Sequence, residues 1–198
     1  SCDNTAMTQT SPRSWWRPAP PPSLTTPQKQ WLMRSGALTQ GLRALGRVEL
    51  RVLREFSAGL AADESDALHR RVRSPVWVRE IAMRIDGRDA VVARSVALLP
   101  STHGVWQGMR KLRTRPLADI LYHDPAIRRS DFEVARVHSR MPVLCPVRQV
   151  LPQDLRSQCA LPLLLARRSV FWRSGEPLMV AECFLPAFWS LLNDSAQG

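Results

Sequence analysis

The chain has 198 residues, of which 44% are hydrophobic, and this length and composition predict one globular domain with a sizeable core. Its formal net charge of +11 favours an anionic partner, but the basic residues are spread along the chain instead of forming one arm. Because no nucleic-acid-binding motif accompanies the charge, a small anionic substrate or a generally cationic surface explains it better. No run approaches the roughly 18 apolar residues of a membrane span, so we expect no transmembrane segment.

Metal and cofactor chemistry leave no signature in the sequence. The four cysteines and four histidines are scattered, without C-x-x-C or H-E-x-x-H spacing. The sequence also has no glycine-rich phosphate loop, no G-x-S-x-G elbow and no defensible Cys–His dyad. Without a secretory signal pattern, we expect a cytoplasmic protein with free thiols, no metal and no cofactor. An enzyme with this sequence would therefore work by positioning and electrostatics.

The first part of the chain is polar and rich in proline. Residues 1–26 have a composition that predicts a mobile or polyproline-like tail, in which Trp15-Trp16 is a candidate for docking onto the domain. A hydroxyl cap followed by proline, at Thr26 and Pro27, predicts a helix that ends near residue 34. A second short helix is expected directly after it.

Segments of alternating hydrophobicity follow, and they predict strands at 48–56, 77–85, 90–99, 132–137, 167–173 and 178–185. Asp86-Gly87 favours a tight hairpin between the second and third of these, because both residues tolerate positive φ. Residues 174–177 connect the last two strands, and short helical stretches are expected at 105–112 and 116–122. Together these elements predict an α+β fold: a single domain with an antiparallel sheet of about six strands and short helices covering one face.

Two of the predicted strands carry a charged residue on their apolar side. Period-two alternation places Arg79 on the face of Ile81, and it places Glu182 on the face of Val180. Burying an unpaired ionised group costs several kcal/mol. The two inward charges therefore indicate either a buried ion pair or a polar pocket within an apolar sheet face.

Four short segments resemble landmarks of the chorismate pyruvate-lyases, in that family's order and at roughly its spacing. They are Trp-Leu at 31–32 with Gly-Ala-Leu-Thr-Gln at 36–40, Trp-Val-Arg-Glu at 77–80, Arg-Pro-Leu-Ala-Asp-Ile-Leu-Tyr at 115–122, and Ala-Glu-Cys-Phe-Leu-Pro at 181–186. The resemblance implies a chorismate lyase-like fold. It also implies a cofactor-independent carbon–oxygen lyase that eliminates pyruvate from chorismate and leaves 4-hydroxybenzoate for ubiquinone biosynthesis.

The same resemblance assigns roles to particular residues. Arg79 is expected to bind the ring carboxylate of chorismate, for which its planar fork is suited, and Glu182 is expected to contact the ring hydroxyl. Leu38 and Leu117 fall where the family uses mainly backbone groups near the carboxylate, and a helix opening at Pro116 would direct amide groups at an anion. The alternative is structural: a salt bridge between the two charged residues, and two ordinary core leucines.

A second cation is expected because chorismate carries two carboxylates. Arg94 and Arg168 are the candidates, and a surface role is the alternative for both. Three positions depart from the family pattern. Arg113 and Ala118 replace usual glycines, which stiffens the turn that contains them, and Tyr122 replaces the more usual Phe.

The expected organisation is a mobile tail over 1–26, a lyase-like domain over 27–190 with an insertion at 139–166, and a C-terminal tail over 191–198. The expected partners are chorismate and 4-hydroxybenzoate, with no nucleic acid, and the protein is expected to be a monomer. The alternative function is a non-catalytic small-molecule-sensing domain, because the lyase fold resembles the effector domains of bacterial transcription regulators. Residues 1–26 are too short and proline-rich for the DNA-binding domain of such regulators, which favours the enzyme.

Overall fold

The structure is a computed structural model that describes residues 14–157 and 162–196. Its centre is a sheet of seven strands in which every pairing is antiparallel. In chain order the strands are β1 (Val48–Gly59), β2 (Pro75–Ile85), β3 (Arg88–Leu98), β4 (Arg128–Arg129), β5 (Glu133–Arg136), β6 (Leu165–Arg173) and β7 (Glu176–Phe184). Their order across the sheet is β1-β2-β3-β7-β6-β4, and β5 also pairs with β6. The α+β antiparallel fold predicted from the sequence is confirmed.

Short helices surround the sheet. They are α1 (Thr26–Leu32), α2 (Leu38–Arg43), α3 (Ala62–Leu68), the 3-10 helices η1 (Pro100–His103) and η2 (Gln107–Lys111), α4 (Ala118–Leu121), α5 (Leu144–Val150), α6 (Gln153–Ser157) and α7 (Pro186–Ser195). The first begins one residue after its cap, Thr25, whose side chain and that of Gln28 form a capping box. Within the described part of the chain, no helix is long and apolar enough to cross a membrane.

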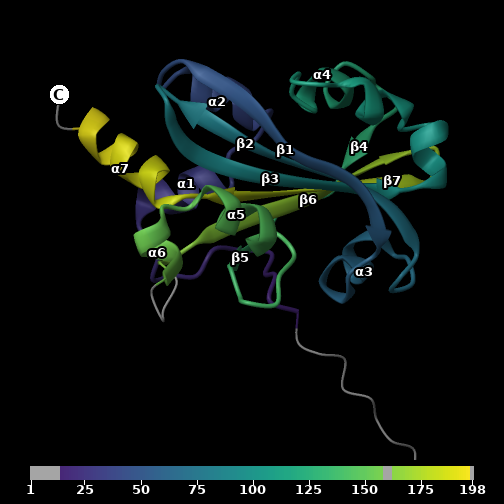
Figure 1. Ribbon diagram of the computed structural model, residues 1–198, viewed down its shortest axis with the longest axis horizontal. Helices are drawn as coiled ribbons and strands as arrows, with labels where there is room; N and C mark the ends of the chain where they lie inside the picture. Colours follow the sequence, from purple (N-terminus) through teal and green to yellow (C-terminus); the bar gives the residue numbers. More distant parts are fainter. Residues whose placement is uncertain (1–13, 158–161, 197–198) are drawn as a thin grey trace, which may run out of the picture.

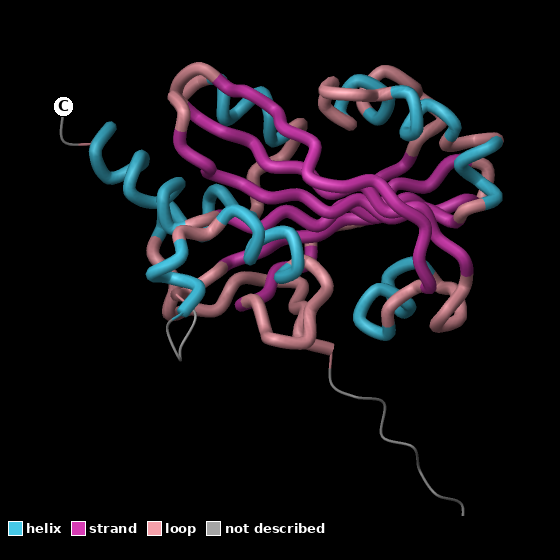
Figure 2. Tube along the Cα trace, viewed as in Figure 1, coloured by secondary structure: helices cyan, strands magenta, loops and turns pink. Residues whose placement is uncertain are grey.

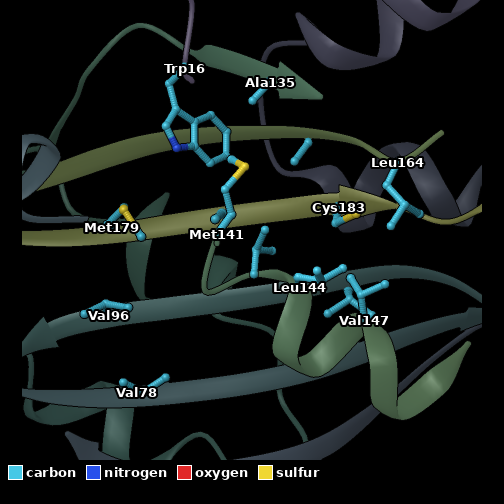
Figure 3. Packing of buried hydrophobic residues seen from close by; sticks show 14 of the residues in the cluster. Trp16, Val78, Val96, Ala135, Met141, Leu144, Val147, Leu164, Met179 and Cys183 are labelled. Carbon is cyan, nitrogen blue, oxygen red and sulfur yellow. The ribbon is translucent and has the colours of Figure 1, made fainter. Parts of the chain in front are cut away.

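The helices cover both faces of the sheet, whereas the sequence predicts cover on one face (Figures 1 and 2). One core packs Val78 and Val96 against Leu144 and Val147 of α5 (Figure 3). A second core includes Ile81, and it packs against α1, α2 and α7. A third packs Phe171 of β6 against Met109 of η2 and Leu121 of α4. Strands β2 and β3 bury residues of both parities, so each face needs its own cover.

The segment before α1 packs on the sheet from residue 14 onward. Trp16 is 4% exposed, and its indole nitrogen donates to the carboxylate of Asp63 at 3.0 Å. Arg17 and Val134 of β5 exchange two backbone hydrogen bonds of 2.8 Å each. For residues 14–26 this differs from the mobile tail predicted over 1–26, because burial of one indole offsets the entropy of ordering the segment. Residues 1–13 lie outside the described residues.

Two other segments, expected as an insertion and as a C-terminal tail, contain helices that pack on the domain. The range 139–166, expected as an insertion, contains α5 and α6, and the buried Leu144 and Val147 of α5 belong to the core. The range 191–198, expected as a tail, begins inside α7, which runs to Ser195 and anchors itself through the buried Phe188. Residues 158–161 and 197–198 lie outside the described residues.

Two hairpin turns set the registers of the sheet. Asp86 and Gly87 have φ of 47° and 80°, and Ser174 and Gly175 have φ of 50° and 73°. Both pairs adopt the left-handed region that a tight two-residue hairpin requires, which glycine enters without strain. The hairpin predicted from Asp86-Gly87 is confirmed.

A bulge in β1 decides which of its charged residues face which side. The register shifts between Val52 and Arg54, so that Arg54 lies opposite Glu80 and Glu55 lies opposite Arg79. One extra residue reverses the alternation beyond it. The bulge therefore gives each buried charge on β2 a partner of opposite sign from β1.

Candidate active site

A small cavity lies on one face of the sheet. Its floor comes from β2, β3, β6 and β7, and residues 37–39 and 116–122 lie over it. Most of the lining is apolar, with Ile81, Met83 and Phe171 among the floor residues. The charged lining residues in the described part of the chain are Arg167 and Glu182. A lining of this kind suits a small ring compound that also carries polar groups.

Glu182 and Arg167 form an ion pair on the cavity floor. They lie directly opposite each other on β7 and β6, and the Nε of Arg167 donates to Oε2 of Glu182 at 2.6 Å. The arginine side chain is 2% exposed and the glutamate side chain is 15% exposed. The sequence indicates an inward Glu182, and the structure supplies its partner from the neighbouring strand. The salt bridge with Arg79, considered from the sequence, is not the one formed.

Arg79 lies on the same face, beneath the turn that leads into α4. Its side chain is 1% exposed, and Nη2 donates to the carbonyl oxygens of Arg113 at 2.8 Å and Arg115 at 2.9 Å. Its Nε lies 3.3 Å from the carboxylate of Glu55. Burial lowers the pKa of Arg79, and Glu55 offsets this only in part. This arginine is not itself among the residues that line the cavity.

The registers place Arg79 and Glu182 at opposite ends of one site. Arg79 pairs with Ser95 of β3, and Ser95 pairs with Val180 of β7, two residues before Glu182. Since β3 lies between the two strands, the charged residues are about 10 Å apart across the sheet and about 7 Å apart along it, which is about 12 Å in all. Ser95, Val180 and the ion pair all line the cavity, so its floor runs from the neighbour of Arg79 to Glu182.

Leu38 and Leu117 both line the cavity from above. Leu38 is the first residue of α2 and is 4% exposed, and Leu117 precedes α4 and is 7% exposed. Both also belong to the apolar cores, so they serve packing as well as lining the cavity. The structure thus brings Leu38, Leu117 and Glu182 together, with Arg79 behind one end.

The two covering segments are joined by a hydrogen bond. The hydroxyl of Tyr122 donates to the carbonyl oxygen of Gly36 at 3.1 Å. Burial raises the pKa of Tyr122, although the charge of Arg129 opposes this, so the phenol keeps its proton and remains a donor. The phenylalanine more usual at this position could not form this bond.

Arg94 and Arg168 lie on the opposite face of the sheet. Arg94 is held by Glu64 at 2.6 Å and by Glu80 at 2.7 Å. Arg168 is held by Glu133 at 2.7 Å and also donates to a main-chain carbonyl of α3. Both are buried, but on strands buried on both faces burial does not identify the cavity side. The structure does not bring these two candidates to the cavity.

Arg167 is the functional candidate that the sequence reasoning missed. A signal for it was present, because a two-residue turn at Ser174-Gly175 fixes the register of the two strands it joins. That register places Arg167 opposite Glu182. Its neighbour Arg168 was considered instead, although adjacent residues on a strand face opposite sides.

An antiparallel sheet with a cavity that holds an arginine–carboxylate pair over an apolar floor defines a small-molecule-binding α+β protein. Residues 10–193 match the family model described as Chorismate lyase. The chain is 55% identical over 176 residues to a probable chorismate pyruvate-lyase of Bordetella pertussis, which covers 89% of this chain and 90% of the relative. It is 37% identical over 176 residues to probable chorismate pyruvate-lyase 1 of Pseudomonas fluorescens, at 89% and 91% coverage. The chain belongs to the chorismate lyase family, as the resemblance in its sequence indicates.

The ligand-binding domain of a putative GntR-family transcriptional regulator from Bordetella bronchiseptica matches with a TM-score of 0.48 and 16% identity. This match covers 71% of the chain and 86% of that domain.

Proposed function

We propose that this chain is a chorismate pyruvate-lyase, which converts chorismate to 4-hydroxybenzoate and pyruvate. The observation that supports this most is the meeting of Leu38, Leu117 and Glu182 at one cavity, with Arg79 behind its end. These are the positions to which the family resemblance assigns substrate contacts. The matched family model, which covers most of the chain, favours catalysis over a purely sensing role.

The reaction balances without an added reactant. The bond between ring carbon C3 and the enolpyruvyl oxygen breaks, and its electrons leave with the enolpyruvyl group. Ring carbon C4 loses its proton, which completes the aromatic ring, and a proton reaches the enolpyruvyl methylene carbon to give pyruvate. The ring hydroxyl stays on C4. Aromatisation drives the elimination, so the protein has to hold the ring, exclude water and stabilise the leaving enolate.

In this proposal Arg79 binds the ring carboxylate. Its cross-strand neighbour Ser95 lines the cavity. So does Leu117, which follows the turn whose carbonyls, those of Arg113 and Arg115, accept hydrogen bonds from Arg79. Those carbonyls are neutral acceptors, and a carboxylate is a stronger partner for a guanidinium. A ligand carboxylate would replace one of these carbonyls as the acceptor for the Arg79 guanidinium, and the turn above it would shift slightly.

Glu182 is proposed to accept a hydrogen bond from the ring hydroxyl. Its position is fixed by the short bond from Arg167, so one carboxylate oxygen is oriented before the ligand arrives. The apolar floor between the two charged ends would hold the flat product ring. Its lining includes Ile81 and Phe171.

Incubating the purified protein with chorismate tests the proposal. We expect 4-hydroxybenzoate and pyruvate to appear in equal amounts. Glu182→Gln should lower the rate strongly, while Arg47→Met, whose side chain is 82% exposed, should leave it unchanged. Melting curves must show that each variant is folded. Saturable binding of 4-hydroxybenzoate without any turnover would overturn the lyase in favour of a sensing domain.

A further inference from the structure

The ion pair on the cavity floor offers a cation for the second negative group of the substrate. We infer that Arg167 binds the enolpyruvyl side of chorismate and stabilises the negative charge on its departing oxygen. This inference rests on the proposed function and gives Arg167 a direct contact with the reacting group.

Arg167 is placed and held as a ligand-binding arginine would be. Its Nε donates to Glu182, and its Nη1 donates to the carbonyl oxygens of Arg34 at 2.7 Å and Trp31 at 3.4 Å. Its guanidinium carbon lies 4.2 Å from the ring centroid of Phe132. These contacts use Nε and Nη1. Within the described residues Nη2 has no hydrogen-bond acceptor, so it is available to a ligand. A side chain fixed this firmly loses little entropy when an anion binds it.

The chemistry of chorismate places its leaving group next to Glu182. The ring hydroxyl is on C4 and the enolpyruvyl ether is on the adjacent carbon, C3. If Glu182 accepts the hydroxyl hydrogen bond, the breaking bond lies beside that carboxylate. The cation nearest to the breaking bond is then the residue paired with Glu182, which is Arg167. It meets both the carboxylate of the enolpyruvyl group and the charge that develops on the oxygen.

The other buried arginines do not fit this role. Arg79 lies about 12 Å from Glu182, where it suits the ring carboxylate. Arg94 and Arg168 lie on the opposite face and are held by carboxylates there. Of the arginines in the described ranges, Arg167 is the one that lines the cavity.

Arg167 also connects the leaving-group end to the cover. The carbonyls of Trp31 and Arg34 belong to the end of α1 and the residues just after it, which lead into the covering residues 37–39. The same guanidinium therefore contacts the substrate and the segment that leads into the cover. The product 4-hydroxybenzoate lacks the enolpyruvyl group, so it makes no use of this part of the site.

That difference between substrate and product gives the test. Arg167→Met should lower kcat/KM for chorismate about 100-fold or more, because a charge contact in the transition state is lost. The affinity for 4-hydroxybenzoate, measured by calorimetry, should fall about tenfold at most, through the looser Glu182 alone. Arg168→Met is the matched control, an equally buried neighbour on the other face with one carboxylate partner, and both quantities should stay within about threefold.

Each outcome decides a separate question. If Arg167→Met lowers kcat/KM and product affinity by the same factor, Arg167 only positions Glu182 and the inference is overturned. If Arg167→Met does not fold, Arg167→Lys keeps the charge without the fork, and chorismate turnover should still fall more than product affinity. Wild-type protein that binds 4-hydroxybenzoate but converts no chorismate overturns the proposed function, and this inference with it.

Discussion

Arg94 and Arg79 are buried on opposite faces of the sheet, and their partners differ. On the face away from the cavity, Arg94 lies between Glu64 and Glu80, with nitrogen–oxygen distances of 2.6 and 2.7 Å. On the cavity face, Arg79 donates from Nη2 to two main-chain carbonyls, and its carboxylate partner Glu55 lies 3.3 Å from Nε. The first site is closed by carboxylates, whereas the second leaves guanidinium charge beside a cavity.

The pKa directions follow the same division. Burial by itself lowers the pKa of Arg94, but hydrogen bonds and charge from Glu64 and Glu80 outweigh it, and the pKa is raised. Burial lowers the pKa of Arg79, and Glu55 offsets this only in part. Arg94, between two buried carboxylates, stabilises the fold, whereas Arg79, beside one partly exposed carboxylate, is suited to bind a further anion. We therefore assign a structural role to Arg94 and ligand binding to Arg79.

The largest expected effect is on the face away from the cavity, which holds Arg94 and which we call the closed face. Arg94→Met leaves the buried carboxylates of Glu64 and Glu80 without their shared cation, so the free energy of unfolding should fall by about 3–5 kcal/mol. Urea unfolding measures this. The folded fraction should bind 4-hydroxybenzoate as the wild type does. A loss of stability below about 1 kcal/mol, or a selective loss of binding, would contradict the structural assignment.

On the cavity face the expected loss is in activity. Arg79→Met should lower kcat/KM for chorismate about 100-fold, because the ring carboxylate loses its charged partner. Stability should fall less than in Arg94→Met, by about 1–3 kcal/mol, since the lost partners are two main-chain carbonyls and the partly exposed Glu55. Steady-state kinetics and urea unfolding of the same preparation separate the two effects. Normal turnover in a folded variant would remove Arg79 from the site.

Saturating 4-hydroxybenzoate supplies a control for this comparison. At a ligand concentration of about 100 times Kd, binding should stabilise the wild type by about 2.7 kcal/mol. The same addition should stabilise Arg94→Met equally and Arg79→Met much less. Equal stabilisation of both variants would mean that the carboxylate of the ligand does not reach Arg79.

The sequence predicts the hairpins well, but it does not predict which face of the sheet holds the cavity. Turn residues such as Asp86-Gly87 carry their own signal, because few residues tolerate the left-handed region. In β2, however, Arg79 and Glu80 are both buried, on opposite faces, and alternation cannot tell which side holds the cavity. That depends on α2, α4 and α5, whose positions come from long-range packing. The same limit explains why Arg94 was a candidate.

The N-terminal segment and the bulge show a second limit. A proline-rich stretch around Trp16 predicts a tail, and its docking depends on Asp63 and Arg168, which come from distant parts of the chain. The bulge after Val52 changes the facing of Glu55 without any glycine or proline to mark it. By contrast, the inward charges of Arg79 and Glu182 could be predicted, because a charge within an apolar alternation is visible locally.

A smaller effect is expected at the cover of the cavity. Tyr122→Phe removes the hydrogen bond that joins the two covering segments, which is worth about 0.5–1.5 kcal/mol. Product should then dissociate about 2- to 10-fold faster, measured by stopped-flow Trp fluorescence. Stability should fall by no more than this amount, because the Tyr122 side chain is partly exposed. An unchanged dissociation rate would show that these segments do not open together.

The smallest expected effect concerns the carboxylate that Trp16 contacts on the closed face. Burial raises the pKa of Asp63, while the Trp16 hydrogen bond and the charge of Arg168 oppose the rise. The folded protein therefore binds this proton more tightly than the unfolded chain, whose ordinary value is 3.8. As pH falls from neutral toward that value, the wild type should gain stability relative to Asp63→Asn, and below it the difference should stay constant.

The size of this change should be below about 1 kcal/mol, because Asp63 is only partly buried and solvent screens its charge. Urea unfolding of both proteins at a series of pH values gives the difference directly, and the exposed Asp66→Asn on the same helix is the matched control. If the wild type instead loses stability relative to Asp63→Asn on acidification, Asp63 acts as an ionised partner of Arg168. The closed face would then hold one more carboxylate–arginine pair than its geometry indicates, which would sharpen its contrast with the cavity face.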